Sequence, residues 1–329
     1  MTTLVARNIR KSYGRVRALN GVSFETEKGE MFGIIGPDGA GKTTLFRILT
    51  SLMLPDEGDV KVGGFDTAGQ YQQVRNLIGY MPGRFSLYQD LSVEENLAFF
   101  ATVYNTTIEE NYHLIEDIYR QIEPFKDRRA GKLSGGMKQK LALCCSLIHK
   151  PEVLFLDEPT TGIDPVSRRE LWELLRKLKA QGITIIVSTP YMDEAVICDR
   201  IALIKNGEFL TVDSPANITK AFPDKLWSVQ TDHRHRLMHD LHNCSFVRSS
   251  FLFGASFHVS FTPDGSPERL ENYLHVSGHT KIGIDCIEPG VEDCFLAMLK
   301  DNDQAELMQT IEGYKRRESD KAIWHLYSS

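Results

Sequence analysis

The chain lacks any run of about 18 or more apolar residues, so the sequence predicts no segment that spans a lipid bilayer. Residues 1–14 lack the apolar core of a signal peptide, and we therefore expect a cytoplasmic protein. The chain also lacks an excess of positive charge, because 38 lysines and arginines face 44 acidic residues and the net charge is −6. A protein held to nucleic acid by phosphate contacts would be basic overall, so nucleic acid is not an expected partner.

Cysteine is scarce: the six residues show no regular disulfide spacing, which predicts free thiols in a reducing compartment. Apolar residues make up 42% and charged residues 25% of the chain, fractions that exclude a disordered or collagen-like protein. A chain of 329 residues is long enough for about two domains, each with its own hydrophobic core.

Residues 1–213 show the pattern of an α/β domain with a mainly parallel sheet. Short, continuously apolar segments predict strands that are buried on both faces. These segments are 31–35, 153–156 and 183–187. One helix is predicted over 42–53, and another begins at the N-cap Asp164, followed by Pro165, and continues to about Ala180.

A helical segment at about 91–150 interrupts this α/β pattern and predicts a helical subdomain. Ser92 followed by Glu95 has the spacing of a capping box, which predicts that a helix begins there. Cys144 and Cys145 fall on a later helix and are expected to lie in its core rather than to act in redox chemistry.

The character of the sequence changes at residue 214. Over 214–300 the predicted order is strand, helix, two strands, helix, strand and a final helix, which predicts a smaller α+β domain of the ferredoxin-like type. Within this domain, His235, His239 and His242 fall on one face of a predicted helix. A solvent-exposed histidine face is a simpler interpretation than a metal site. Residues 301–329 are polar and charged, and we expect a C-terminal tail.

A glycine-rich segment at 36–43 matches the P-loop pattern G-x-x-x-x-G-K-S/T between a predicted strand and a predicted helix. Its glycines let backbone N–H groups turn toward phosphate oxygens, and the N-terminus of the helix favours negative charge. Lys42 is expected to reach the β- and γ-phosphates of a nucleotide, and the Thr43 hydroxyl to ligate Mg²⁺. The predicted nucleotide-binding residues here are Gly36, Pro37, Asp38, Gly39, Ala40, Gly41, Lys42, Thr43 and Thr44.

Two acidic residues, Asp157 and Glu158, follow the apolar strand 153–156. A carboxylate at that position can hold Mg²⁺, which makes Asp157 a candidate metal ligand. Glu158 is placed to accept a proton from attacking water, as a general base does. Acidic residues are common at strand ends, so an ordinary polar strand end remains the alternative for this pair taken alone.

A third motif lies between the helical segment and Asp157. Its residues are Leu133, Ser134, Gly135, Gly136, Met137, Lys138 and Gln139. This stretch resembles the LSGGQ-type signature of ATP-binding cassette (ABC) ATPases, with Met137 in place of the usual glutamine. Small residues at a helix N-terminus form an anion site, which in this family receives the γ-phosphate of a nucleotide held by a second subunit.

The resemblance extends from Leu4 to about Val212 and implies ATP and Mg²⁺ as ligands. Tyr13 matches the aromatic residue that stacks on adenine, and Asp164 matches the D-loop. The resemblance further implies a dimer of two cassettes, identical or different, and a separate transmembrane permease subunit. It places the chain at the inner face of the cell membrane.

Two positions depart from the family pattern. Gly83 stands where the family has the Q-loop glutamine, and Pro190 stands where it has the switch histidine. Glycine has no side chain to position water, and proline has neither an imidazole nor a backbone N–H. Both residues therefore predict a weakened site, unless Gln89 or a neighbour of Pro190 substitutes.

The segment 290–296 resembles the end of ATPase subunits in drug-resistance-type ABC type-2 exporters, although an amphipathic helix packed on the domain explains it as well. We therefore expect an ATPase subunit of a multidrug-type exporter. Two alternatives stay open: a regulatory subunit that binds ATP but hardly hydrolyses it, and a soluble ABC protein outside transport.

Overall fold

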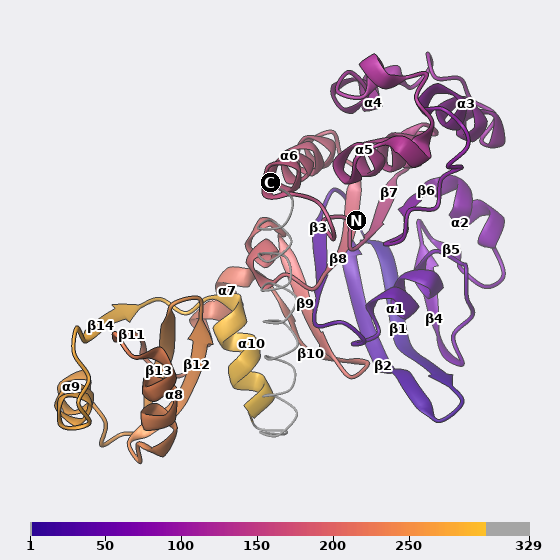
Figure 1. Cartoon of the computed structure of the whole chain (residues 1–329). Helices are drawn as coiled ribbons and strands as arrows, with labels where there is room; N and C mark the ends of the chain where they lie inside the picture. The colour runs from indigo at the N-terminus through magenta and orange to yellow at the C-terminus, as the bar shows by residue number, and fades with distance from the viewer. Residues whose placement is uncertain (1, 301–329) are drawn as a thin grey trace. The chain divides into compact units, whose positions relative to one another are not determined.

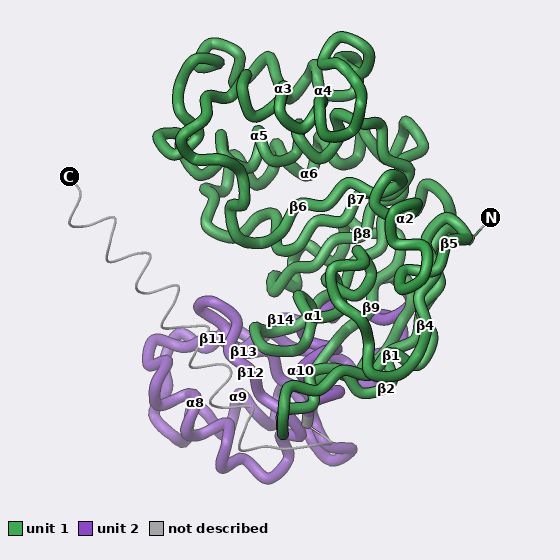
Figure 2. Tube along the Cα trace, turned by 90° about the vertical axis from the view of Figure 1, so that its right-hand side faces the viewer, with its two compact units in different colours: residues 1–215 green, residues 216–329 purple. Residues whose placement is uncertain are grey.

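The computed structural model describes residues 2–300, so the predicted tail at 301–329 lies outside the described residues. The described part of the chain forms two compact units, which divide after residue 215 (Figure 2). Within the described part, no helix combines the length and the apolar character needed to cross a membrane.

A six-stranded sheet forms the centre of the first unit, in the order β10-β9-β3-β8-β7-β6 (Figure 1). All neighbours are parallel except the hairpin of β9 and β10. The strands are β3 (Met31–Ile35), β6 (Ile78–Met81), β7 (Val153–Asp157), β8 (Thr184–Thr189), β9 (Arg200–Lys205) and β10 (Glu208–Asp213). This sheet confirms the predicted α/β class, and its parallel strands bring their carboxyl ends to one edge, where polar loops can meet.

A second, antiparallel sheet in this unit has the order β2-β1-β4-β5. Its strands are β1 (Thr2–Tyr13), β2 (Val16–Glu27), β4 (Glu57–Val62) and β5 (Phe65–Asp66). The sequence prediction missed it, because bulges in β1 and its partners break the regular alternation of apolar and polar residues that marks a strand. Side chains of both sheets and of α1 (Lys42–Leu49) share one hydrophobic core.

Helices α6 (Pro165–Ala180) and α1 differ in how well the sequence predicted their bounds. α6 has the predicted bounds, because Asp164 caps it by accepting hydrogen bonds from two backbone N–H groups of its first turn. α1 ends at Leu49, so the prediction of a helix up to residue 53 is wrong. Ser51 adopts a left-handed φ of 59°, and the N–H groups of Leu52 and Met53 turn back to the Arg47 carbonyl, which terminates the helix.

Three helices build the helical subdomain: α3 (Val93–Val103), α4 (Tyr112–Tyr119) and α5 (Gly135–Leu147). α5 contacts α3, α4 and strand β6, so it joins the subdomain to the sheet (Figure 1). The predicted capping box is confirmed, since Ser92 and Glu95 bond reciprocally at the start of α3. Cys144 and Cys145 are buried, as expected for core residues. Short segments complete the unit: α2 (Tyr71–Leu77), η1 (Glu123–Phe125), η2 (Ala130–Lys132) and η3 (Met192–Ile197).

The second unit has a four-stranded antiparallel sheet in the order β12-β13-β11-β14. Its elements are α7 (Pro215–Lys220, which begins one residue before the unit), β11 (Leu226–Gln230), α8 (Arg234–Asn243), β12 (Val247–Phe253), β13 (Ser256–Phe261), α9 (Pro267–Val276), β14 (Gly283–Ile287) and α10 (Val291–Lys300). This chain order and strand order are those of the predicted ferredoxin-like arrangement.

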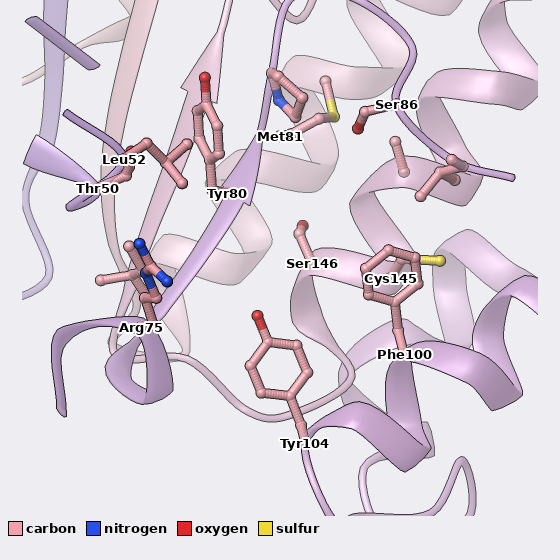
Figure 3. Close-up of a pocket in the computed structure, with 14 residues that line it drawn as sticks. Thr50, Leu52, Arg75, Tyr80, Met81, Ser86, Phe100, Tyr104, Cys145 and Ser146 are labelled. Atoms are coloured by element: carbon pink, nitrogen blue, oxygen red, sulfur yellow. The ribbon is translucent and has the colours of Figure 1, made fainter. Parts of the chain in front are cut away.

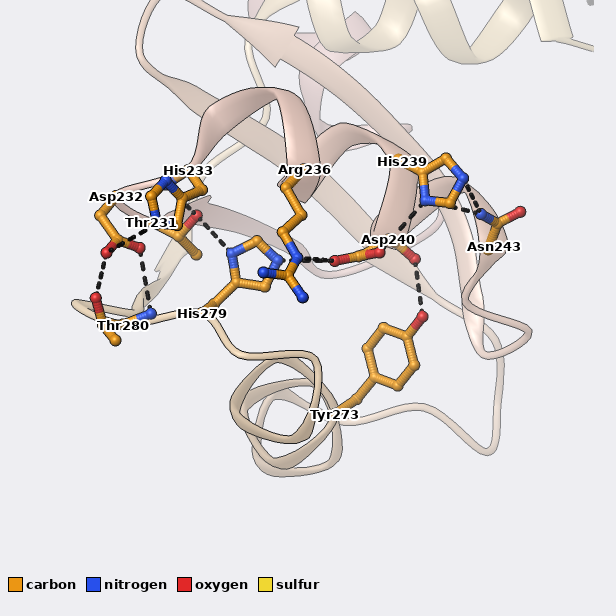
Figure 4. Close-up of polar contacts among 10 residues, drawn as sticks. All are labelled: Thr231, Asp232, His233, Arg236, His239, Asp240, Asn243, Tyr273, His279 and Thr280. Carbon is orange, nitrogen blue, oxygen red and sulfur yellow. Dashed lines mark hydrogen bonds and ion pairs between the residues drawn. The ribbon is translucent and has the colours of Figure 1, made fainter.

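Buried polar contacts hold α8 and the segment before β14 together in this unit (Figure 4). The side chain of His279 is fully buried, and its ring nitrogens contact Thr231 Oγ1 at 3.1 Å and Asp240 Oδ2 at 2.8 Å. Leu237 and Leu241 of α8 are also buried, whereas the three histidines of that helix are exposed. The predicted solvated histidine face agrees with this placement.

Candidate nucleotide-binding site

The P-loop connects β3 to α1, and its shape depends on glycine at two positions. A Cβ atom on Gly36 would lie 2.2 Å from the carbonyl oxygen of Ile204. Gly41 has a φ of 104°, and a Cβ atom there would lie 2.4 Å from the Ala18 carbonyl oxygen. Gly41 is also the N-cap of α1 and supplies no side-chain oxygen to its first turn, which contains no acidic residue. The N-terminus of α1 is therefore suited to an anion.

Lys42 lies inside this loop, with its side chain only 3% exposed. Its Nζ donates hydrogen bonds to the carbonyl oxygens of Gly36 at 2.9 Å and Pro37 at 3.0 Å. The same ammonium group lies 3.1 Å from Oε1 of Glu158. The structure thus brings together the predicted phosphate-binding lysine and the predicted base.

Asp157 and Glu158 stand at the carboxyl end of β7, beside β8. Asp157 is buried, and its Oδ1 accepts a hydrogen bond from Ser188 Oγ at 2.6 Å. The backbone N–H of Glu158 donates to Ser188 Oγ at 3.0 Å and to the Ser188 carbonyl at 3.1 Å. Glu158 has a φ of 52°, a conformation that ordinary residues rarely adopt and that functional sites often contain. Ser188 fixes both carboxyl residues, and the sequence prediction missed it because nothing in its spacing marks it.

The oxygen donors near the P-loop have the chemistry that Mg²⁺ prefers, namely the Thr43 hydroxyl and the buried Asp157 carboxylate. Tyr80 lies on β6, next to β7. Burial, together with the charge of Asp157, raises the pKa of the Tyr80 hydroxyl to about 12, so this side chain stays neutral near the site.

Gly83 lies directly against the backbone of the Asp157-Glu158 pair. A Cβ atom on Gly83 would be 3.0 Å from the Asp157 carbonyl oxygen and 3.7 Å from Glu158 Cβ. A longer side chain at this position would therefore start beside the predicted base. Pro190 is buried and follows Thr189, whose carbonyl oxygen accepts a hydrogen bond from the Gly36 N–H at 3.3 Å. Gly83 thus borders the predicted metal ligand and the predicted base, and Pro190 follows a residue that is hydrogen-bonded to the P-loop.

The signature segment begins α5, with Ser134 as N-cap and its Oγ accepting from the Met137 N–H at 3.3 Å. Ser134 and Gly135 are exposed. A Cβ atom on Gly136 would lie 2.8 Å from Ser167 Oγ, and that hydroxyl donates to Asp164 Oδ2 at 2.7 Å. The signature segment therefore packs against the D-loop residues at the start of α6.

Tyr13 ends β1 and is 46% exposed, with its hydroxyl 3.0 Å from the sulfur of Met53. Its exposed ring is available to a flat ligand, and the contacts of the described residues do not link it directly to Lys42 or Glu158.

A pocket of about 250 Å³ lies where β6 and α2 meet the helical subdomain (Figure 3). Its walls are mostly apolar or aromatic, with Arg75 on the α2 side. Lining residues include Arg75, Tyr80, Leu87, Phe100, Tyr104 and Cys145. Next to it, Lys138 of α5 lies with its Nζ 5.4 Å from the centre of the Phe85 ring, so the signature helix contacts the segment that follows Gly83.

The sequence profile of the family described as ABC transporter matches residues 19–161. The chain is 36% identical over 294 residues to the probable multidrug ABC transporter ATP-binding protein YbhF of Escherichia coli, covering 87% of this chain and 50% of that protein. The chain thus spans about half the length of that curated relative. It is also 40% identical over 210 residues to the Nod factor export ATP-binding protein I of a Rhizobium species, covering 63% of this chain and 69% of the relative.

Solved structures agree with these relatives. One is an ATP-binding subunit of an ABC transporter, with a TM-score of 0.62, 28% identity and coverage of 67% of this chain and 93% of the other. Another is a dimeric ATP-binding cassette in a post-hydrolysis state bound to ADP and Pi, with a TM-score of 0.58, 27% identity and coverage of 64% and 98%. The P-loop, the carboxylate pair and the signature segment lie on one α/β unit, in agreement with these relatives. The chain therefore belongs to the family of ATP-binding proteins of ABC transporters.

Proposed function

We propose that this chain binds and hydrolyses ATP as the ATPase subunit of a multidrug-type ABC exporter. The observation that carries this proposal is the contact of Lys42 with Glu158 at 3.1 Å within a glycine-shaped P-loop. That contact unites a phosphate-binding cation with a base candidate in one site. The name of the Rhizobium relative supports an export function, and the name of the E. coli relative supports multidrug transport.

Hydrolysis would be a phosphoryl transfer to water, which depends mainly on positioning and electrostatics. The N-terminus of α1 and the Lys42 ammonium bind the phosphates, so the triphosphate competes with Glu158 for that ammonium. Thr43 and Asp157 would hold Mg²⁺, which neutralises phosphate charge when bound. Released from Lys42, the Glu158 carboxylate accepts the proton of the attacking water. Tyr13 would stack on adenine through its exposed ring.

We further propose that this site hydrolyses ATP slowly, because Gly83 and Pro190 offer no side-chain donor or acceptor to the γ-phosphate and the water. Loss of one such preorganised contact typically lowers the rate by roughly 10²- to 10³-fold. Gly83 lies against the backbone of Asp157 and Glu158, so the Cβ atom of a glutamine at this position would lie next to that backbone. Gln89 is the alternative source of an amide: it is exposed and its carbonyl accepts the Gly131 N–H, which ties it to the segment before the signature.

The signature segment supports a role across a dimer. Ser134 and Gly135 are exposed at the N-terminus of α5, so a nucleotide on a second cassette can reach them. An intact signature and a weakened P-loop site together favour a heterodimer, in which this chain completes the competent site of a different cassette.

A separate permease subunit would dock at the pocket shown in Figure 3 and at the segment 84–88 beside it. Tyr88 is 51% exposed and packs edge-on against Phe99, which is 39% exposed. Exposed aromatic side chains beside an apolar pocket suit a helical segment of a membrane partner, which would hold the chain at the inner face of the membrane.

The proposed function is tested by ATP turnover of the chain alone and with a candidate partner cassette. We expect slow turnover alone, and a rise with the partner that is lost when Ser134 is changed to Arg in this chain. Turnover of about 1 s⁻¹ or more by the isolated chain would contradict the weakened site.

A regulatory subunit that binds ATP but hardly hydrolyses it is the second candidate, favoured by Gly83 and Pro190. The Glu158→Gln variant separates the two functions. If Glu158 is the base, the variant abolishes the residual turnover and leaves Mg-ATP affinity nearly unchanged. Residual turnover equal in parent and variant would favour the regulatory subunit.

A further inference from the structure

One buried carboxylate outside the proposed nucleotide site accepts four hydrogen bonds. Glu194 lies in η3 with its side chain 1% exposed. Its Oε2 accepts from the hydroxyls of Thr160, at 3.1 Å, and Thr189. Its Oε1 accepts from Arg168 Nε at 2.6 Å and from Trp172 Nε1 at 3.0 Å. A buried carboxylate is stable only with such complete pairing.

The donors come from the segments that surround the proposed site. Thr160 lies two residues after Glu158, in a turn where the Thr161 N–H bonds to the Glu158 carbonyl at 3.2 Å. Thr189 precedes Pro190, and its carbonyl accepts from the first N–H of the P-loop. Arg168 lies one helical turn after Asp164, and its N–H bonds to the Asp164 carbonyl. The Glu194 carboxylate therefore connects three segments: the turn after Glu158, the Thr189-Pro190 segment and helix α6, which begins after Asp164.

Arg168 is itself held in one orientation. Its Nη2 donates to both carboxylate oxygens of Asp193 at 2.8 Å, and its guanidinium lies 4.5 Å from the centre of the Tyr191 ring. Burial is the largest single influence on Arg168 and would lower its pKa, but the charges and hydrogen bonds of Glu194 and Asp193 together outweigh burial and raise that pKa. A neutral residue at 194 would leave the half-buried Arg168 cation with weaker compensation.

We infer that Glu194 is a positioning residue that fixes the Glu158 turn relative to the Thr189-Pro190 segment. It acts through the Thr160 and Thr189 hydroxyls and not on ATP itself. The Thr189 hydroxyl also accepts a hydrogen bond from the Tyr191 N–H at 3.1 Å, so its contact with Glu194 is connected to the backbone on both sides of Pro190. This role rests on the proposed function, since it concerns the geometry of the same hydrolysis site.

The test compares Glu194→Gln with the parent full-length chain by single-turnover hydrolysis of radiolabelled ATP, Mg-ATP calorimetry and thermal unfolding. We expect the hydrolysis rate to fall by about tenfold or more, because sub-ångström displacement of a base suffices for that loss. Mg-ATP affinity should stay within about twofold, since Lys42 and the P-loop glycines are unchanged. Glu173→Gln is the matched control on exposed α6 surface and should change neither quantity.

Thr160 provides a second, milder perturbation. Thr160→Val removes one hydrogen-bond donor at nearly constant volume and should lower the hydrolysis rate. Thr160→Ser keeps the hydroxyl and should hydrolyse ATP at the rate of the parent chain. An unchanged rate in both Glu194→Gln and Thr160→Val would overturn the positioning role. A parallel loss of hydrolysis rate, ATP affinity and melting temperature would also overturn it, because that result would indicate that Glu194 only stabilises the fold. Absence of Mg-ATP binding by the parent chain would instead show that the proposed function has failed, and the role would fall with it.

Discussion

Restoring both departing positions should convert this chain into a faster ATPase. The double variant Gly83→Gln, Pro190→His returns an amide beside the Asp157-Glu158 backbone and an imidazole after Thr189. A Cβ atom at position 83 meets the Asp157 carbonyl oxygen at 3.0 Å, so that carbonyl must shift by a few tenths of an ångström to admit it. The site can therefore accept the new side chain with local adjustment, and a small fall in melting temperature is expected.

The size of the gain follows from the contacts restored. One preorganised donor to a developing anion is worth roughly 10²- to 10³-fold in rate. Restored contacts in one site are not additive, so we expect the double variant to exceed the parent by at least about 10²-fold. Mg-ATP affinity should change little, because Lys42 and the backbone of the P-loop stay as they are.

Steady-state release of phosphate by the chain alone measures this gain. Gly83→Ala combined with Pro190→Ala is the matched control, because it adds the same Cβ atom at position 83 and removes the proline ring without supplying an amide or an imidazole. Glu158→Gln in the restored chain should abolish the gain. Equal turnover in parent and restored chain, with Mg-ATP still bound and the fold intact, would refute the assignment of Gly83 and Pro190 as the cause of a weak site.

Three further predictions concern folding and thiols. Burial would raise the pKa of Asp240, but hydrogen bonds from His279 and His239 and the charges of His279 and Arg236 together hold it below its usual 3.8. The resulting stability is present above this pH and is lost as the pH falls further, so the melting temperature of the second unit should drop below about pH 4, and Asp240→Asn should flatten that dependence. Ser92→Ala removes the cap that bonds to Glu95 and should lower the free energy of unfolding by about 1 kcal/mol in a denaturant titration. Cys286 is exposed and the other five cysteines are buried, so a thiol reagent should label one cysteine rapidly in the native protein and six after unfolding.

The sequence predicted those parts of the fold that depend on local chemistry. α6 follows from the Asp164-Pro165 start, and the βαββαβ order predicted the second unit, because each strand there has turn residues at its ends. The antiparallel sheet was missed because bulges break the alternation along the local β1-β2 hairpin, and because the pairing of β1 with β4 spans the P-loop and α1 and leaves no local signal. The overlong α1 prediction failed because the left-handed turn at Ser51 carries no glycine.

Residues of the candidate site could be predicted where they belong to a sequence motif. They could not be predicted where their role depends on tertiary contacts alone. Lys42 and Glu158 were assigned from motifs that lie far apart in the sequence, and the fold brings them to 3.1 Å. Ser188 and Glu194 were not assigned, since serine and glutamate are common at such positions and only their partners in space give them a role.

The most direct test of the central claim is calorimetry of Mg-ATP with the intact chain. We predict one bound nucleotide per chain, with affinity lost by tenfold or more in Lys42→Ala, because a charged hydrogen bond contributes roughly 1.5–3 kcal/mol. Heat release identical in parent and Lys42→Ala, or no uptake of Mg-ATP by a folded sample, would contradict a nucleotide site at the P-loop of this chain.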